Sequence, residues 1–106
     1  MISIDNLYQG EDLEFILSET DPEIDITLNT YKGGIGKGEL YYPFTFTNQS
    51  DGTIQILLDN TVTQNIAPGV YVGEIFQIQG ESQFVITAIS VRILQTKTQK
   101  GYNATN

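Results

Sequence analysis

The chain has 106 residues, no Cys and no His, and a formal net charge of −8 at pH 7. This length fits one domain, and the two missing residue types exclude disulfides, thiolate metal sites and histidine-based acid–base catalysis. An acidic surface is repelled by phosphate, so we expect neither a nucleic-acid partner nor contact with an anionic membrane. Residue usage favours β-structure, with 14 Ile, 5 Val, 12 Thr, 6 Tyr and 5 Phe against 3 Ala.

In the first part of the chain, apolar and polar residues alternate over short segments. This alternation predicts strands at residues 2–4, 13–17 and 24–28. Turns are predicted between them, at 7–10 and at 18–22, where an Asp-Pro pair disfavours regular structure. We expect no export signal, because the first residues lack a basic stretch followed by a long apolar core.

Residues 31–38 hold four glycines and raise the question of a phosphate-binding loop. The Walker pattern needs Gly where Tyr31 stands and Ser or Thr where Gly38 stands, and the dinucleotide-binding pattern also fails. Glycines outside such a pattern usually form a flexible connection. We therefore predict a flexible loop in this segment.

Four further strands are predicted in the rest of the chain. Two of them, at 40–47 and 53–59, are joined by a hairpin turn that ends in Asp-Gly. A polar connection or partial strand follows at 60–66, and two long strands at 67–78 and 83–94 then form a second hairpin.

Together the segments give seven strand candidates and no convincing helix. The spacing of the turns predicts an all-β fold, a single antiparallel immunoglobulin-like β-sandwich of about seven strands. The sandwich is expected over residues 1–94, and residues 95–106 are expected to form a polar C-terminal tail or arm.

The long second hairpin has two apolar faces. A tip at residues 80–81 places Glu74 opposite Thr87 on one of them. Because burial of an unpaired carboxylate is costly, we expect this face to be exposed and to serve as a protein-interaction surface. The predicted interface residues are Val70, Val72, Phe76, Val85, Ile89 and Val91.

The opposite face of this hairpin is expected in the core. It carries Tyr71, Ile75, Phe84 and Ile86. Two alternatives stay open, since a loop could cover the outer face, or the register could be off by one residue. Tyr71 itself is either a plain core residue or a tyrosine corner, in which the hydroxyl returns to a nearby backbone group.

The acidic and aromatic residues raise the question of other binding chemistry. Alternating acids at 19–25 could converge on Ca²⁺ or form a solvated edge, although the glycine of an EF-hand-like loop is missing. The 13 acidic residues show no motif that singles out a catalytic pair. Exposed tyrosines, with Tyr31, Tyr41 and Tyr102 as candidates, are compatible with carbohydrate binding.

Three short motifs occur in an order that suggests a family. They are Tyr-Gln-Gly-Glu-Asp at 8–12, Pro-Glu-Ile-Asp-Ile-Thr at 22–27 and Pro-Gly-Val-Tyr-Val-Gly-Glu-Ile at 68–75. Over about residues 7–90, the chain thereby resembles the small immunoglobulin-like modules of tailed bacteriophage virion proteins. It is similar in particular to the N-terminal domain of upper baseplate proteins.

The resemblance implies a structural role and a location in the virion, after synthesis in the host cytoplasm. Other virion proteins, or repeated copies of the chain itself, would be its partners. Baseplate proteins continue beyond the point that corresponds to Asn106, which favours a capsid auxiliary, head-fibre or tail-attachment subunit. We therefore expect a non-enzymatic virion protein without catalytic residues, cofactor or metal. A carbohydrate-binding module for host-surface attachment is the alternative.

Overall fold

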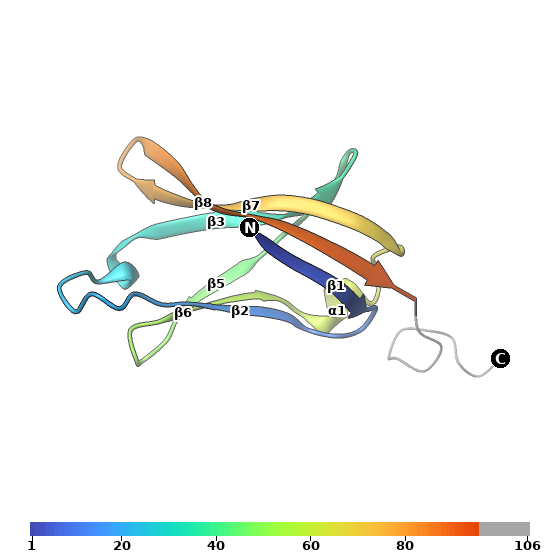
Figure 1. The fold of residues 1–106 in the computed structure, drawn as a ribbon, viewed down its shortest axis with the longest axis horizontal. Coiled ribbons are helices and arrows are strands. Elements are labelled where there is room, and N and C mark those ends of the chain that lie inside the picture. Colours follow the sequence, from blue (N-terminus) through green and yellow to red (C-terminus); the bar gives the residue numbers. More distant parts are fainter. Residues whose placement is uncertain (96–106) are drawn as a thin grey trace.

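Two β-sheets face each other across one apolar core in the computed structural model, which describes residues 1–95 (Figure 1). The strand order is β1-β8-β7-β3-β4 in the five-stranded sheet and β2-β6-β5 in the three-stranded sheet. The strands are β1 (Ile2–Tyr8), β2 (Leu13–Leu17), β3 (Thr30–Lys37), β4 (Leu40–Pro43), β5 (Thr45–Asn48), β6 (Ile54–Leu58), β7 (Gly69–Gln79) and β8 (Ser82–Leu94). All neighbours are antiparallel except β1, which runs parallel to β8. The chain is thus an all-β, immunoglobulin-like sandwich, as predicted.

The core is filled by the inward-facing side chains of both sheets. Alternation along the strands supplies them, as in β6, where Ile54, Ile56 and Leu58 are buried and the residues between them are half-buried. Tyr71 is the largest fully buried side chain, and its hydroxyl donates to the backbone oxygen of Ala67 at 2.7 Å. This bond identifies Tyr71 as a tyrosine corner, which decides between the two alternatives left open by the sequence.

The strand predicted at 24–28 is wrong. Residues Ile26–Leu28 form a single 3₁₀ turn, η1, which Asp25 caps by accepting a hydrogen bond from the backbone N–H of Thr27 at 3.0 Å. Such a local side-chain bond offers the backbone an alternative to a sheet ladder. Ile26 is buried, whereas Leu28, which a strand would place on the same face, is 82% exposed.

The glycine-rich segment is a strand and not the flexible loop that we predicted. β3 is an inner strand of its sheet, paired with β7 and, from Gly34 to Lys37, also with β4. The glycines allow the backbones of neighbouring strands to approach closely, since a Cβ at Gly73 of β7 would overlap the backbone oxygen of Gly34 in β3. Their role here is close packing.

The predicted strand at 40–47 is two strands, one in each sheet. The chain crosses between the sheets at Phe44, whose backbone N–H donates to Gly33 at 2.8 Å and whose ring is buried. The turn at 48–52 forms as predicted. The connection after β6 contains one helical turn, α1 (Asn60–Thr63), which Asp59 caps.

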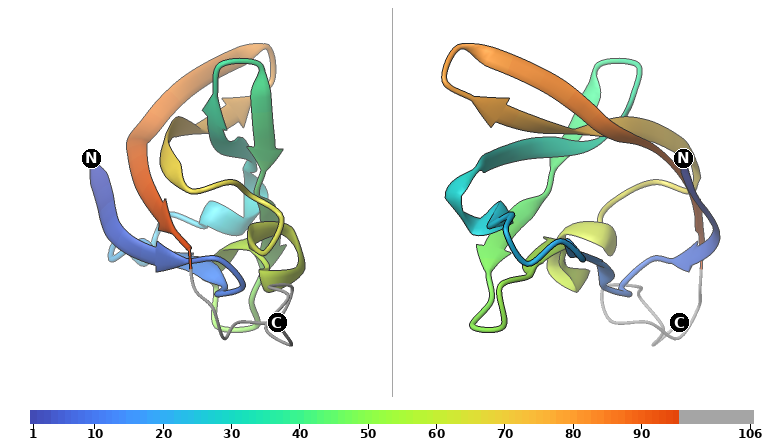
Figure 2. Two further views of the ribbon diagram at one scale, coloured as in Figure 1. Left: turned by 90° about the vertical axis from the view of Figure 1, so that its right-hand side faces the viewer. Right: turned by 60° about the vertical axis from the view of Figure 1, so that its left-hand side comes forward.

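The β7–β8 hairpin follows the predicted register near its tip only. Gln79 pairs with Ser82 and Phe76 pairs with Val85, as predicted, but Ile86 is an extra residue on β8. This bulge shifts every later pair by one, so that Ile75 lies opposite Thr87. The hairpin end extends away from the three-stranded sheet (Figures 1 and 2).

Four predicted positions are wrong, two because of the bulge and two because the hairpin end extends beyond the core. Ile89 and Val91, predicted on the exposed face, are 1% and 0% exposed and belong to the core. Phe84 and Ile86, predicted in the core, are 52% and 39% exposed on the projecting end of the hairpin. The predicted C-terminal arm lies outside the described residues from residue 96 onward.

Candidate functional site

The outer face of the five-stranded sheet carries the candidate site. Along β7, Val70, Val72, Glu74 and Phe76 alternate with residues that point into the core. Val70 and Val72 are 51% and 60% exposed, Phe76 is half-buried, and Val85 beside Phe76 on β8 is 56% exposed. Four of the six predicted interface residues therefore share this face. We call Val70, Val72, Phe76 and Val85 the outer apolar patch.

The buried Tyr71 determines which face of β7 carries the outer apolar patch. Its ring is held in the core by packing and by the bond from its hydroxyl to Ala67. Successive residues of a strand point to opposite faces, so a buried Tyr71 turns Val70 and Val72 outward. Glu74 also points outward, as its charge predicted, although the bulge places it opposite Ala88 and not Thr87.

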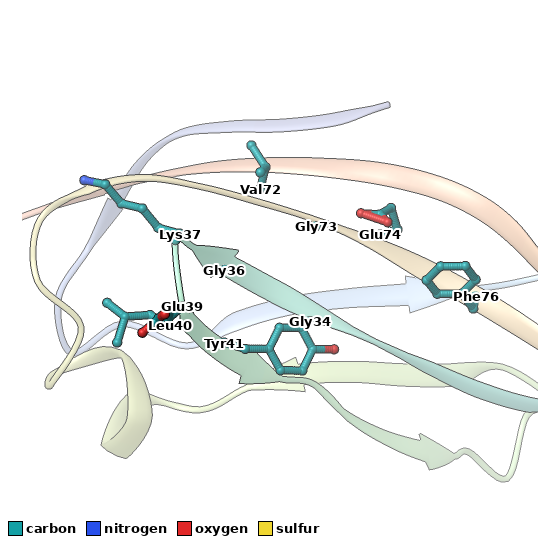
Figure 3. A pocket seen from close by; sticks show the side chains of 11 residues that line it. Gly34, Gly36, Lys37, Glu39, Leu40, Tyr41, Val72, Gly73, Glu74 and Phe76 are labelled. Atoms are coloured by element: carbon teal, nitrogen blue, oxygen red, sulfur yellow. The ribbon is translucent and has the colours of Figure 1, made fainter.

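A groove of about 390 Å³ lies beside the patch, over the glycines of β3 (Figure 3). Gly34 and Gly36 face the groove and contribute no side chains. Its lining residues are Gly34, Gly36, Lys37, Gly38, Glu39, Leu40, Tyr41, Val72, Gly73, Glu74 and Phe76. The missing side chains on β3 thus open a hollow between β4 and β7.

Tyr41 forms the β4 side of the groove and is 60% exposed. Its ring lies against β3, with its Cζ 2.9 Å from the point where a Cβ on Gly34 would stand (Figure 3). On the β7 side, the Glu74 carboxylate adds a hydrogen-bond acceptor. The ammonium group of Lys32 lies 5.7 Å from the centre of the Phe76 ring, within cation–π range. The groove therefore combines aromatic, acidic and apolar surface.

The other predicted tyrosines lie elsewhere. Tyr31 is half-buried, stacks on Phe46 and donates its hydroxyl to the backbone oxygen of Ile26 at 3.0 Å. It is therefore a structural residue. Tyr102 lies outside the described residues.

The acidic side chains before η1 form hydrogen bonds with the backbone of their own segment. Glu19 accepts from the backbone N–H of Asp21, and Asp21 accepts from that of Glu23, each at 3.0 Å. These are local turn-capping bonds. Within residues 1–95, no three acidic side chains converge in a way that could hold a metal ion. The same part of the chain has no helix long and apolar enough to cross a bilayer.

Sequence reasoning missed the groove. The sequence contained a signal, because Gly34 and Gly36 are two residues apart and Tyr41, which the structure pairs with Gly36, follows them closely. Reading residues 31–38 as a loop concealed it. If the segment is read as a strand, its alternate glycines leave one face without side chains, next to an aromatic residue.

No protein-family model matches the chain, and no curated protein matches it in sequence. Among solved structures, a provisionally assigned glycoside hydrolase from Bacteroides vulgatus is similar, with a TM-score of 0.58 and 7% identity. The match covers 87% of this chain and 16% of that one, so the chain spans about a sixth of its length. The titin M3 domain matches with a TM-score of 0.48 and 8% identity, over 88% of this chain and 90% of that one. The first similarity is one of fold alone.

Proposed function

We propose that this chain is a non-catalytic structural subunit of a bacteriophage virion that works through protein–protein contacts. The observation that carries the proposal is the outer apolar patch. Its three valines are each more than half exposed, and they lie on adjacent strands together with Phe76. Exposed apolar side chains that gather on one face of a sheet are typical of interaction sites.

The scaffold beneath the patch suits a contact surface. β7 is an inner strand that pairs with β8 from Gly69 to Gln79 and with β3 from Val72 to Ile78, so Val72 and Phe76 are held by strands on both sides. Charged groups accompany the apolar ones, because Glu74 lies between Val72 and Phe76 along β7 and the Lys32 ammonium group lies over the Phe76 ring. Interfaces between proteins commonly combine the two kinds of surface. The resemblance of residues 68–75 to a virion-protein motif supports the proposal from the sequence, and this segment contains Val70 and Val72.

A pair of matched variants tests this role. Val72→Asp introduces a charge into the patch, and Ile16→Asp introduces the same charge at a β2 residue of similar exposure, 54%, on the other sheet. Thermal unfolding first shows that both variants fold. In phage grown with each variant as the only source of the chain, we expect virions to lack Val72→Asp and to incorporate Ile16→Asp. Equal incorporation of the two would overturn the assignment of the patch.

A second candidate function, carbohydrate binding, is favoured by the groove. Tyr41 presents an exposed ring beside the Glu74 carboxylate, and an aromatic ring with a nearby acceptor is a suitable platform for a sugar. A glycan array with wild type, Tyr41→Ala and Tyr8→Ala tests it, because Tyr8 is 43% exposed and lies on β1, outside the groove lining. Binding that is lost only in Tyr41→Ala would support this function. An array without hits would remove it.

A further inference from the structure

One edge of the five-stranded sheet is open next to the β7–β8 turn. β1 pairs with β8 only from Ile89 to Leu94, whereas β8 begins at Ser82. Residues 82–88 therefore pair with β7 on one side. Among residues 1–95, no strand lies along their other side, and no turn or loop bond reaches it. In Figure 1 this is the orange part of β8 beyond the start of β1.

This open edge lacks the usual protection against pairing. Natural sheets place charged residues or Pro on their edges, and two other edges here do so, with Pro43 at the end of β4 and Glu14 in β2. Residues 82–88 read Ser-Gln-Phe-Val-Ile-Thr-Ala and contain neither. Phe84, Val85 and Ile86 are 52%, 56% and 39% exposed. Such an edge is a template for an added strand.

We propose that the added strand is the same segment of a second copy, paired antiparallel about a two-fold axis at Val85. The segment is nearly symmetric about that residue. Antiparallel pairing on this axis places Phe84 opposite Ile86, Gln83 opposite Thr87 and Ser82 opposite Ala88. Each pair joins residues of one kind, apolar, polar or small. A two-fold interface requires this self-complementarity, which an edge shaped for an unrelated strand would not need.

The rest of the molecule is compatible with this pairing and limits its strength. β1 occupies the edge from Ile89 onward, so the paired segment ends at residue 88. The bulge at Ile86 bends the strand beside the axis, which interrupts the ladder in both copies. Two chains of net charge −8 repel each other, and salt screens this repulsion. We therefore expect a reversible dimer that becomes stronger as the salt concentration rises.

The inference concerns an edge and does not rest on the proposed virion role. The dimer pairs the backbone edge of residues 82–88, and of the outer apolar patch this edge contains only Val85. Conversely, a protein that stays monomeric in solution can still enter a virion through Val72. The two proposals therefore fail separately.

Single cysteines give the sharpest test, because the chain has none of its own. Directly opposed Cβ atoms in an antiparallel pair lie about 4.5–5.5 Å apart, close to the span of a disulfide. On the proposed axis, Val85→Cys faces its own copy. Under mild oxidation we expect a covalent dimer of twice 11.8 kDa from Val85→Cys. Val72→Cys, which is similarly exposed on an inner strand, should remain at the monomer mass.

Light scattering of the full, unmodified chain completes the test. The mass should rise from 11.8 kDa towards twice that value with concentration, and Val85→Lys should remain at 11.8 kDa. Amide exchange in residues 82–88 should slow as the wild-type concentration increases. Wild type that remains monomeric at every concentration overturns the inference. If Val72→Cys cross-links as fast as Val85→Cys, the inference is also overturned, because the chains then associate through the outer face of the sheet.

Discussion

Replacing Tyr71 by Phe removes one hydroxyl group from the core and leaves the ring in place. That hydroxyl donates to the backbone oxygen of Ala67 at 2.7 Å, and the Tyr71 side chain is 1% exposed. A hydrogen bond of this kind contributes about 0.5–1.5 kcal/mol to the free energy of unfolding. Ala67 is exposed, so water can reach its carbonyl group after the substitution. We therefore expect a loss of about 1 kcal/mol, and not the larger cost of a buried, unpaired group.

Urea unfolding measures this loss. Tyr71→Phe should unfold at a lower urea concentration with an unchanged slope, because the surface exposed on unfolding stays the same. Tyr41→Phe is the control, since Tyr41 is 60% exposed and should lose its hydroxyl without effect on stability. The tyrosine-corner assignment is refuted if Tyr71→Phe is as stable as Tyr41→Phe.

The same hydroxyl makes stability depend on pH. Burial, and then the neighbouring Tyr42, raise the pKa of Tyr71 above its ordinary value of 10.0. The unfolded chain therefore releases this proton at a lower pH than the folded chain does. The contribution of Tyr71 to the free energy of unfolding is therefore fully present below about pH 10 and is lost as the pH rises above this value. Tyr71→Phe should show a smaller loss of stability between neutral and strongly alkaline pH in the same assay.

Substitutions at three further positions test the packing and the local caps. Gly73→Ala should reduce the free energy of unfolding in urea by about 2–3 kcal/mol, since its Cβ would overlap the backbone of Gly34 in the next strand; wild-type stability would refute the close-packing role of the glycines. Thr63→Val should reduce the free energy of unfolding by about 1–3 kcal/mol, because the buried Thr63 hydroxyl donates to the Glu11 carbonyl at 2.7 Å. Thr63→Ser keeps the hydroxyl and should reduce it much less. Equal losses in the two variants would contradict this role of the hydroxyl. The hydrogen bond from the Thr61 hydroxyl lowers the pKa of Asp59, so stability should fall below about pH 4, and Asp59→Asn should flatten this acid dependence of the melting temperature.

The sequence predicted elements whose signals are local. β2 was predicted at its observed bounds because its alternation and flanking turns lie within a few residues. The outward direction of Glu74 was also predicted, because the cost of burying its charge depends little on register. These inferences required only properties of the residues themselves.

The errors came from features that depend on distant neighbours. The bulge at Ile86 is not marked by any residue type, and it moved Ile89 and Val91 from the predicted interface into the core. β3 was read as a loop because its glycines suggested flexibility, whereas they are needed for contact with β7, about forty residues later in the chain. Part of the outer apolar patch could therefore be predicted, and the groove beside it could not.

The resemblance to phage modules and the outer apolar patch lead to one claim, that Val72 faces another protein in a virion. A photo-cross-linking residue at position 72, compared with one at position 16, tests this claim directly in purified virions. Both positions are more than half exposed, on opposite sheets. We predict a covalent link to a virion protein from position 72 and none from position 16. Absence of the chain from the particles, or equal linking from the two positions, would contradict the claim.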